Sequence, residues 1–115
     1  MFYADLQNAL ITAIPELEAS LIEMRGKWEP EQIPNYVLFE DLVVPFVDDR
    51  IKAGADSFIR KAFGFIEEMA RSENQEVRDL VYIAIYEGRE NEFLDRWLPQ
   101  SGPTAKALVK QYAAG

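Results

Sequence analysis

The segment Ala55–Arg71 reads ADSFIRKAFGFIEEMAR, and its apolar residues recur at the three- and four-residue spacing of an α-helix. One apolar stripe consists of Phe58, Ala62, Phe65 and Met69, and Ile59, Phe63, Ile66 and Ala70 widen it. The next helix is predicted to start after a cap at Ser72 or Asn74 and to run to about Glu87. It is apolar nearly all round, which is typical of a central, well-buried helix, at Leu80, Val81, Ile83, Ala84 and Ile85.

The remaining helices are predicted between proline and glycine residues, which interrupt regular structure. They span about Phe2–Ala13, Glu16–Met24, Asn35–Ile51, Glu90–Leu98 and Pro103 onward. No stretch alternates apolar and polar residues between hairpin turns, so we expect no β-strand. The chain is predicted to be one all-α domain, residues 1–115, of six or seven short helices packed as antiparallel hairpins. Phe58–Glu87 resembles a HEAT-type helix pair, but no second copy is visible and a long solenoid is not expected.

Local signals place the ends of the second and third helices. Gly26 predicts the end of the second helix, because glycine is a common C-terminal stop. Trp28–Pro34 is then expected to be a loop, since its two prolines disrupt regular pairing. Asn35 is a suitable N-cap for the next helix. Pro45 lies inside that helix and predicts a kink or break near Asp41.

Composition excludes several classes of function. The chain has 115 residues, 49% of them hydrophobic, and a net charge of −8. This balance argues against binding of nucleic acid or of an anionic membrane, because both require clustered cations. Cysteine and histidine are absent, so thiolate nucleophiles, Cys/His zinc sites and Ser-His pairs are excluded. The N-terminus has no basic targeting region and no apolar run of membrane-spanning length, which predicts a soluble, cytoplasmic protein.

Carboxylate pairs are the remaining candidates for acid–base or metal chemistry. Asp41 and Asp48 are seven residues apart, about 10 Å along a helix, which is too far for one metal without ligands from other segments. Glu67 is more simply placed to pair with Arg71 at the next helical turn. No glycine-rich phosphate loop is present. We therefore expect no enzyme activity, no metal and no cofactor.

The negative charge is concentrated in the first half of the chain. Residues 1–50 carry ten acidic and three basic residues, whereas residues 51–115 carry ten and nine. The segment Trp28–Asp49 contains six acidic residues and no basic one, interleaved with aromatic residues. Such a segment is either a solvated face that aids solubility or a docking surface for a cationic partner, since aromatic anchors and complementary charge are features of interfaces.

The candidate partner-binding residues combine the carboxylates with the two aromatic residues that do not lie at core spacing. They are Trp28, Glu29, Glu31, Tyr36, Glu40, Asp41, Asp48 and Asp49. Phe39 and Phe46 lie at core spacing, and the sequence leaves open whether they belong to the core or to an interface.

Four segments resemble the small all-helical immunity proteins of bacterial polymorphic and contact-dependent inhibition toxin systems. They are EDLVVPFVDD at Glu40–Asp49, FIEEMA at Phe65–Ala70, EVRDLV at Glu76–Val81 and SGPT at Ser101–Thr104. The resemblance implies an antitoxin that binds a cognate toxin tightly and stoichiometrically in the cytoplasm. Many such toxins are nucleases with basic clefts, which an acidic surface would enter as a phosphate mimic or block from beside.

Two other functions remain open at this stage. One is a non-enzymatic HEAT-like adaptor that binds its partner through the C-terminal helices, and the other is a carboxylate-based metal enzyme. The oligomeric state is not specified by any feature of the sequence.

Overall fold

Helices account for nearly the whole chain in the computed structural model, which describes residues 1–115. A 3-10 turn at Tyr3–Asp5 precedes α1, and another at Pro15–Leu17 precedes α2. Two long helices each contain a π-helical segment, η3 between α3 and α4 and η4 after α6. The bounds are α1 Leu6–Ala13, α2 Glu18–Trp28, α3 Asn35–Leu38, η3 Phe39–Val43, α4 Val44–Lys52, α5 Asp56–Ala70, α6 Gln75–Leu80, η4 Val81–Tyr86, α7 Asn91–Trp97 and α8 Pro103–Ala114. The predicted all-α fold is confirmed, with seven continuous helices and no strand.

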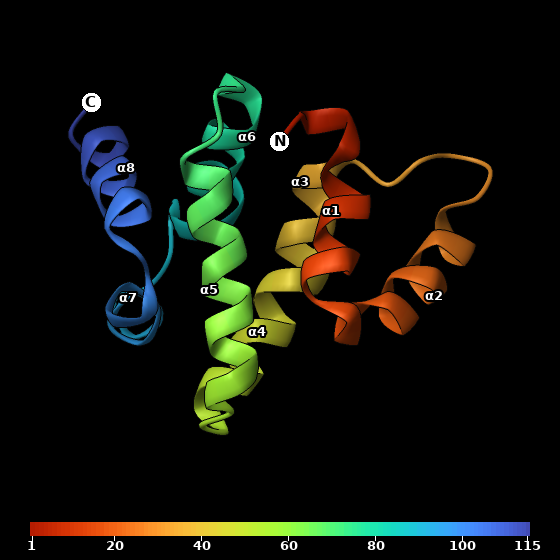
Figure 1. Cartoon of the computed structure of the whole chain (residues 1–115), viewed down its shortest axis with the longest axis horizontal. Coiled ribbons are helices and arrows are strands. Elements are labelled where there is room, and N and C mark those ends of the chain that lie inside the picture. The colour runs from red at the N-terminus through yellow and green to blue at the C-terminus, as the bar shows by residue number, and fades with distance from the viewer.

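Helix α5 lies at the centre of the molecule and packs against α1, α4, α6 and α8 (Figure 1). Short connections turn the chain back on either side of α5, at residues 53–55 and 71–74. Gly54 and Gly88 have positive φ angles of 70° and 71° at two helix ends, a conformation that glycine adopts readily. Helix α2 lies at one end of the 39 Å long axis, and α7 and α8 lie at the other.

One apolar core of 29 buried residues joins all the helices. Trp97 is fully buried, and it stacks on Phe93 with ring centroids 4.7 Å apart. Phe63 and Tyr86 meet the same indole edge-on, at 5.1 and 6.3 Å. The Tyr86 hydroxyl shares a hydrogen bond of 2.5 Å with Ser101 Oγ, so its polar atom is satisfied inside the core.

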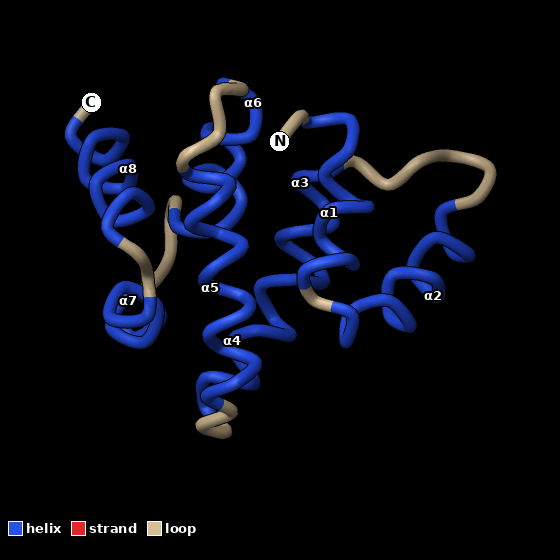
Figure 2. The backbone as a smooth tube through the Cα atoms, viewed as in Figure 1, coloured by secondary structure: helices blue, strands red, loops and turns tan.

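The predicted end of the second helix at Gly26 is wrong, because α2 continues to Trp28. A Cβ added at Gly26 would meet nothing within 4 Å, so the position imposes no special need for glycine, and Lys27 pairs with Glu23 one turn earlier within the helix. The first residue that cannot continue the helix is Pro30, and the residue before a proline is driven out of the helical region. The connection from α2 to α3 is therefore residues 29–34, the long tan loop of Figure 2.

The predicted N-cap role of Asn35 is also wrong. Pro34 occupies the N-cap position, and Asn35 is the first helical residue. The Asn35 amide instead joins α3 to the N-terminal segment: Nδ2 donates to the Tyr3 carbonyl at 3.1 Å, and Oδ1 accepts from Gln7 at 3.2 Å. Asn74 is the N-cap of α6, and its side chain accepts from the Val77 N–H at 3.2 Å.

The irregularity predicted near Asp41 is confirmed as the π-helical segment η3. Pro45 has no N–H to donate to the Asp41 carbonyl four residues earlier, so the regular helical ladder fails there. The preceding Val44 N–H donates instead to Phe39, five residues back. The chain stays helical through the disturbance, and η3 packs against the second π-helical segment, η4.

Candidate partner-binding surface

A shallow groove of about 400 Å³ separates the end of α2 from η3. Half-buried Met24, Trp28 and Leu42 supply its apolar surface, and exposed Asp41 lies at its edge. Asp41 forms no ion pair. The one ion pair at this groove joins Lys27 to Glu23. Two residues that the sequence singled out, Trp28 and Asp41, are thus brought to one groove from different elements.

A larger groove of about 790 Å³ lies between α1 and the α2–α3 loop, and Glu29 and Glu31 line it. Its wall is a polar network in which Gln7 donates to the Ile33 carbonyl at 2.9 Å and accepts from Arg25 Nη2 at 3.0 Å. Arg25 is the one cation in the groove, and it is used in this network rather than in an ion pair with either glutamate. Both carboxylates are exposed and uncompensated.

Tyr36 follows on α3, where 42% of the residue is exposed. The Glu40 carboxylate one turn later interacts with its hydroxyl and raises the pKa of Tyr36, and the charge of Glu87 acts in the same direction. A negative charge disfavours the tyrosinate, which explains the sign of the shift. Tyr36 is therefore an exposed aromatic ring beside carboxylates. We call the set Trp28, Glu29, Glu31, Tyr36, Glu40 and Asp41 the α2–α3 surface.

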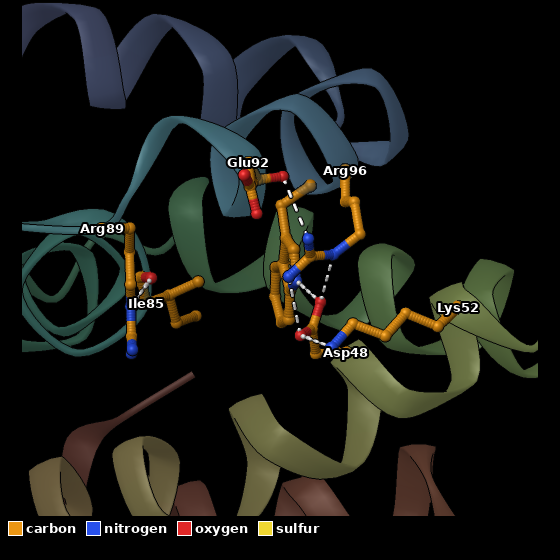
Figure 3. Close-up of polar contacts among 7 residues, drawn as sticks. Asp48, Lys52, Ile85, Arg89, Glu92 and Arg96 are labelled. Atoms are coloured by element: carbon orange, nitrogen blue, oxygen red, sulfur yellow. Dashed lines mark hydrogen bonds and ion pairs between the residues drawn. The ribbon is translucent and has the colours of Figure 1, made fainter.

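Asp48, which the sequence proposed as a partner-binding residue, does not belong to this surface, because its carboxylate is paired within the chain (Figure 3). Its carboxylate accepts two hydrogen bonds from Arg96, from Nε and Nη2, each of 3.0 Å, and a third of 2.9 Å from Trp97 Nε1. Lys52 Nζ lies 3.4 Å away. Partial burial opposes ionisation of Asp48, but the bonds from Arg96 and Trp97 outweigh it and hold the pKa below its usual value.

The neighbouring Asp49 is exposed and forms no ion pair, but it lines neither groove. Successive residues on a helix point about 100° apart, so two adjacent aspartates have different surroundings. The open question about the phenylalanines is also answered. Phe39 is fully buried in the core, and half-buried Phe46 packs on Phe58 at 5.5 Å under the guanidinium of Arg50.

Sequence reasoning missed Ile83, which it assigned to a helix buried all round. The residue is 44% exposed in η4. Glu76, Asp79 and Glu87 share its helical phase, and Glu76 and Glu87 are exposed. That polar stripe was the signal in the sequence, because an isoleucine within it must face solvent.

The remaining acidic side chains do not form a site with obvious chemistry. No group of three or more carboxylates converges to hold a metal ion. Glu67 is used structurally, since its two oxygens accept from the Thr104 and Ala105 N–H groups at 3.0 and 2.8 Å, and no Glu67–Arg71 ion pair forms. None of the helices is both long enough and apolar enough to traverse a bilayer.

Comparison with known proteins places the chain in a family but not beside a characterised relative. Neither the curated proteins nor the solved structures include a significant match to this chain. A family model matches residues 8–112, which is nearly the whole chain and includes the α2–α3 surface, the Asp48 network and Ile83. The chain belongs to the family described as a domain of unknown function, DUF7674.

Proposed function

We propose that the protein is an immunity protein, which neutralises a cognate bacterial toxin by direct stoichiometric binding and not by catalysis. The observation that supports this is the state of the acidic residues in Trp28–Asp49. Of the six, only Asp48 is paired with a cation. Asp41 lies at the groove that Trp28 lines, Glu40 interacts with the Tyr36 hydroxyl, and Glu29 and Glu31 line the larger groove. Complementary charge steers association, and aromatic side chains supply much of the affinity of interfaces.

A cationic partner explains why these charges are left uncompensated within the chain. Like charges this close repel one another and lower the stability of the folded state. A basic surface removes that repulsion on binding, and the gain is available only in the complex. We propose a nuclease as the toxin, because its nucleic-acid cleft is basic, and the cytoplasm as the place where the two meet. The α2–α3 surface then either enters that cleft as a phosphate mimic or covers its entrance.

The genomic neighbour gives the direct test. We expect the adjacent reading frame to encode an exported protein with a variable C-terminal toxin domain. Production of that domain alone should stop growth, and co-production of this chain should restore it. The two purified proteins should form a 1:1 complex by size-exclusion chromatography with light scattering.

Charge reversal then locates the surface. The triple variant Glu29→Lys, Glu31→Lys, Asp41→Lys should slow association by about tenfold or more at low salt. Each of the single variants Glu29→Lys, Glu31→Lys and Asp41→Lys should slow association more than Asp95→Lys, which changes the net charge by the same amount at an exposed, unpaired residue on α7 at the opposite end of the long axis. Equal rates for the single variants and Asp95→Lys would contradict the proposed surface.

The alternative, a helical adaptor, is favoured only by the hairpin of α5 with α6 and η4. It predicts binding through the C-terminal helices and no effect of the triple reversal. Growth protection separates the two functions, because an adaptor would not rescue cells from the neighbouring toxin domain.

A further inference from the structure

Two large apolar side chains are exposed on elements that pack directly together. Tyr36 on α3 and Ile83 in η4 are 42% and 44% exposed, and α3 packs against η4. The other large exposed apolar residues are Met1 and Phe2 at the start of the chain and Ile22 on the isolated helix α2. Tyr36 and Ile83 therefore stand apart as exposed apolar residues contributed by both halves of the sequence.

Carboxylates flank this pair from both elements. Glu40 lies one turn after Tyr36, and Glu87 lies one turn after Ile83. Glu87 ends η4, which packs against α3, and the charges of Glu40 and Glu87 both raise the pKa of Tyr36. Neither glutamate forms an ion pair. The one nearby cation, Arg89, is held by its own helix end, where it donates to the Ile85 and Ala84 carbonyls at 2.8 and 3.0 Å.

The negative charge of Glu40 and Glu87 decides whether a second copy of the chain or a cationic protein fits this surface better. A symmetric dimer would bring the same patch of two copies together, and Glu40 and Glu87 would then face carboxylates of like charge. Desolvating like charges against each other is costly. A partner with an apolar side chain between lysine or arginine residues would instead pair with both glutamates. Exposed apolar groups rimmed by charge are a feature of protein interaction sites.

We propose that Tyr36 and Ile83 form the apolar anchor of a docking site for a cationic protein partner, with Glu40 and Glu87 as its charged rim. This inference deepens the proposed function and rests on it, because the partner is the toxin. It extends the binding surface from the acidic first half of the chain to η4 in the second half. Ile83 contributes to the affinity of the complex, and Glu40 and Glu87 raise the association rate and orient the partner.

The test measures binding of the purified toxin domain from the adjacent reading frame. Ile83→Ala should raise the Kd by about 30-fold, mainly through faster dissociation, as expected for a central anchor residue. Ile22→Ala is the matched control, because Ile22 is an even more exposed isoleucine, at 61%, on a helix of the same protein. Glu87→Gln should instead slow association and weaken its salt dependence.

Both isoleucines are exposed, so thermal unfolding followed by circular dichroism should show folded variants. A Kd changed by less than threefold in Ile83→Ala, together with slow association of the triple variant, would overturn this inference and leave the proposed function intact. No binding by the unaltered chain would overturn both. A dimer of the free protein that Ile83→Ala dissociates would overturn the cationic partner in favour of a second copy.

Discussion

The carboxylate of Asp48 links two helices that are far apart in the sequence. It holds α4 against α7 through two bonds from Arg96 and satisfies the indole N–H of the fully buried Trp97. Charge-assisted and bidentate bonds are among the strongest in proteins, and only 15% of the Asp48 side chain is exposed to water that would weaken them. Asp48 therefore belongs to the framework that positions the helices.

Removal of this carboxylate should destabilise the fold. Asp48→Ala leaves the Trp97 N–H and the Arg96 guanidinium without their acceptor, which should cost about 2 kcal/mol of unfolding free energy. Urea unfolding followed by tryptophan fluorescence measures it. Asp49→Ala is the control and should stay within about 0.5 kcal/mol, because Asp49 is exposed and unpaired. Equal losses in the two variants would show that the network contributes nothing.

Acid should destabilise the fold by protonating carboxylates that accept hydrogen bonds within it. The pKa values of Asp48 and Glu67 are both lowered in the folded state, so the unfolded chain binds more protons at low pH. Their contribution is complete above the unfolded pKa values, near 4, and disappears as the pH falls through the lower folded values. The Asp48→Ala variant should therefore show a shallower loss of melting temperature below about pH 4.5 than the unaltered chain.

Alkali should destabilise the fold by ionising Tyr86, because burial raises the pKa of this tyrosine to about 12. A raised pKa favours the protonated form in the folded state, so the contribution is complete below pH 10 and is lost as the pH rises through about 12. The pKa values of Tyr36 and Tyr112 are also raised. Titration of tyrosine absorbance at 295 nm should therefore show several late-ionising groups, and Tyr86→Phe should remove the latest of them. An unchanged titration in that variant would assign the latest group to another tyrosine.

The sequence showed only in part which residues are exposed at the candidate surface and which are paired or buried within the fold. The neighbouring Asp48 and Asp49 are chemically identical, and the position of Arg96 on α7, which comes 48 residues after Asp48, decides that Asp48 is paired with α7 and Asp49 is not. Ile83 shows the opposite case. Its exposure could be read from the polar residues in its helical phase, but the apolar richness of the segment concealed it.

At the scale of elements, helix positions were predictable and helix ends less so. Proline and glycine spacing located all seven continuous helices, because interruption of a helix is a local property of the backbone. The sequence placed the end of α2 at about Met24, with Gly26 as the stop, whereas the helix continues to Trp28, because a glycine inside a helix costs only about 1 kcal/mol and can be tolerated. Long-range caps such as Glu67 on α8 depend on packing and leave no local pattern.

The contact of Glu67 with α8 gives an element-scale prediction. A Cβ on Gly102 would lie 2.5 Å from Glu67 Cδ, so Gly102→Ala should displace the carboxylate that caps α8 and cost about 1–2 kcal/mol. Glu67→Ala should cost a similar amount. Because both changes break one contact, the double variant should lose less than the two losses added together, and full additivity would contradict the capping role.

Glycines inside two helices are expected to behave in the opposite way: their change to alanine should raise the stability of the fold. Gly26 and Gly64 lie in α2 and α5, and an added Cβ at either position meets no atom within 4 Å. Each change to alanine should stabilise the protein by about 0.5–1 kcal/mol, through the higher helix propensity of alanine. Thermal melts compare them with Gly54→Ala, which should destabilise because φ is 70° at Gly54. A stabilised Gly54→Ala protein would contradict this account.

At the scale of the whole molecule, the charge is distributed unevenly over one continuous core. Residues 1–50 carry a net charge of −7, and the α2–α3 loop, which carries Glu29 and Glu31, lies at the end of the long axis opposite α7 and α8. The fold class and this imbalance could be predicted from composition and spacing alone. The approach of Trp28 to Asp41, and of α3 to η4, required the packing of separate helices.

The imbalance predicts how the proposed complex should respond to salt. Association with the toxin domain should slow by at least about tenfold between 10 and 300 mM sodium chloride, because screening shortens the reach of the acidic surface. Stopped-flow fluorescence measures the rate. Dissociation should change much less, and an association rate independent of salt would exclude electrostatic steering.

The two tryptophans give the chain separate optical reporters. Trp97 is sealed in the core, so its emission follows unfolding, whereas half-buried Trp28 lines an open groove and its emission should respond to an occupant. A protein with Trp28→Phe would signal folding alone. In a protein with Trp97→Phe, the remaining Trp28 would report occupation of the groove as long as the fold is intact, so arrival of a ligand could be timed without any attached dye.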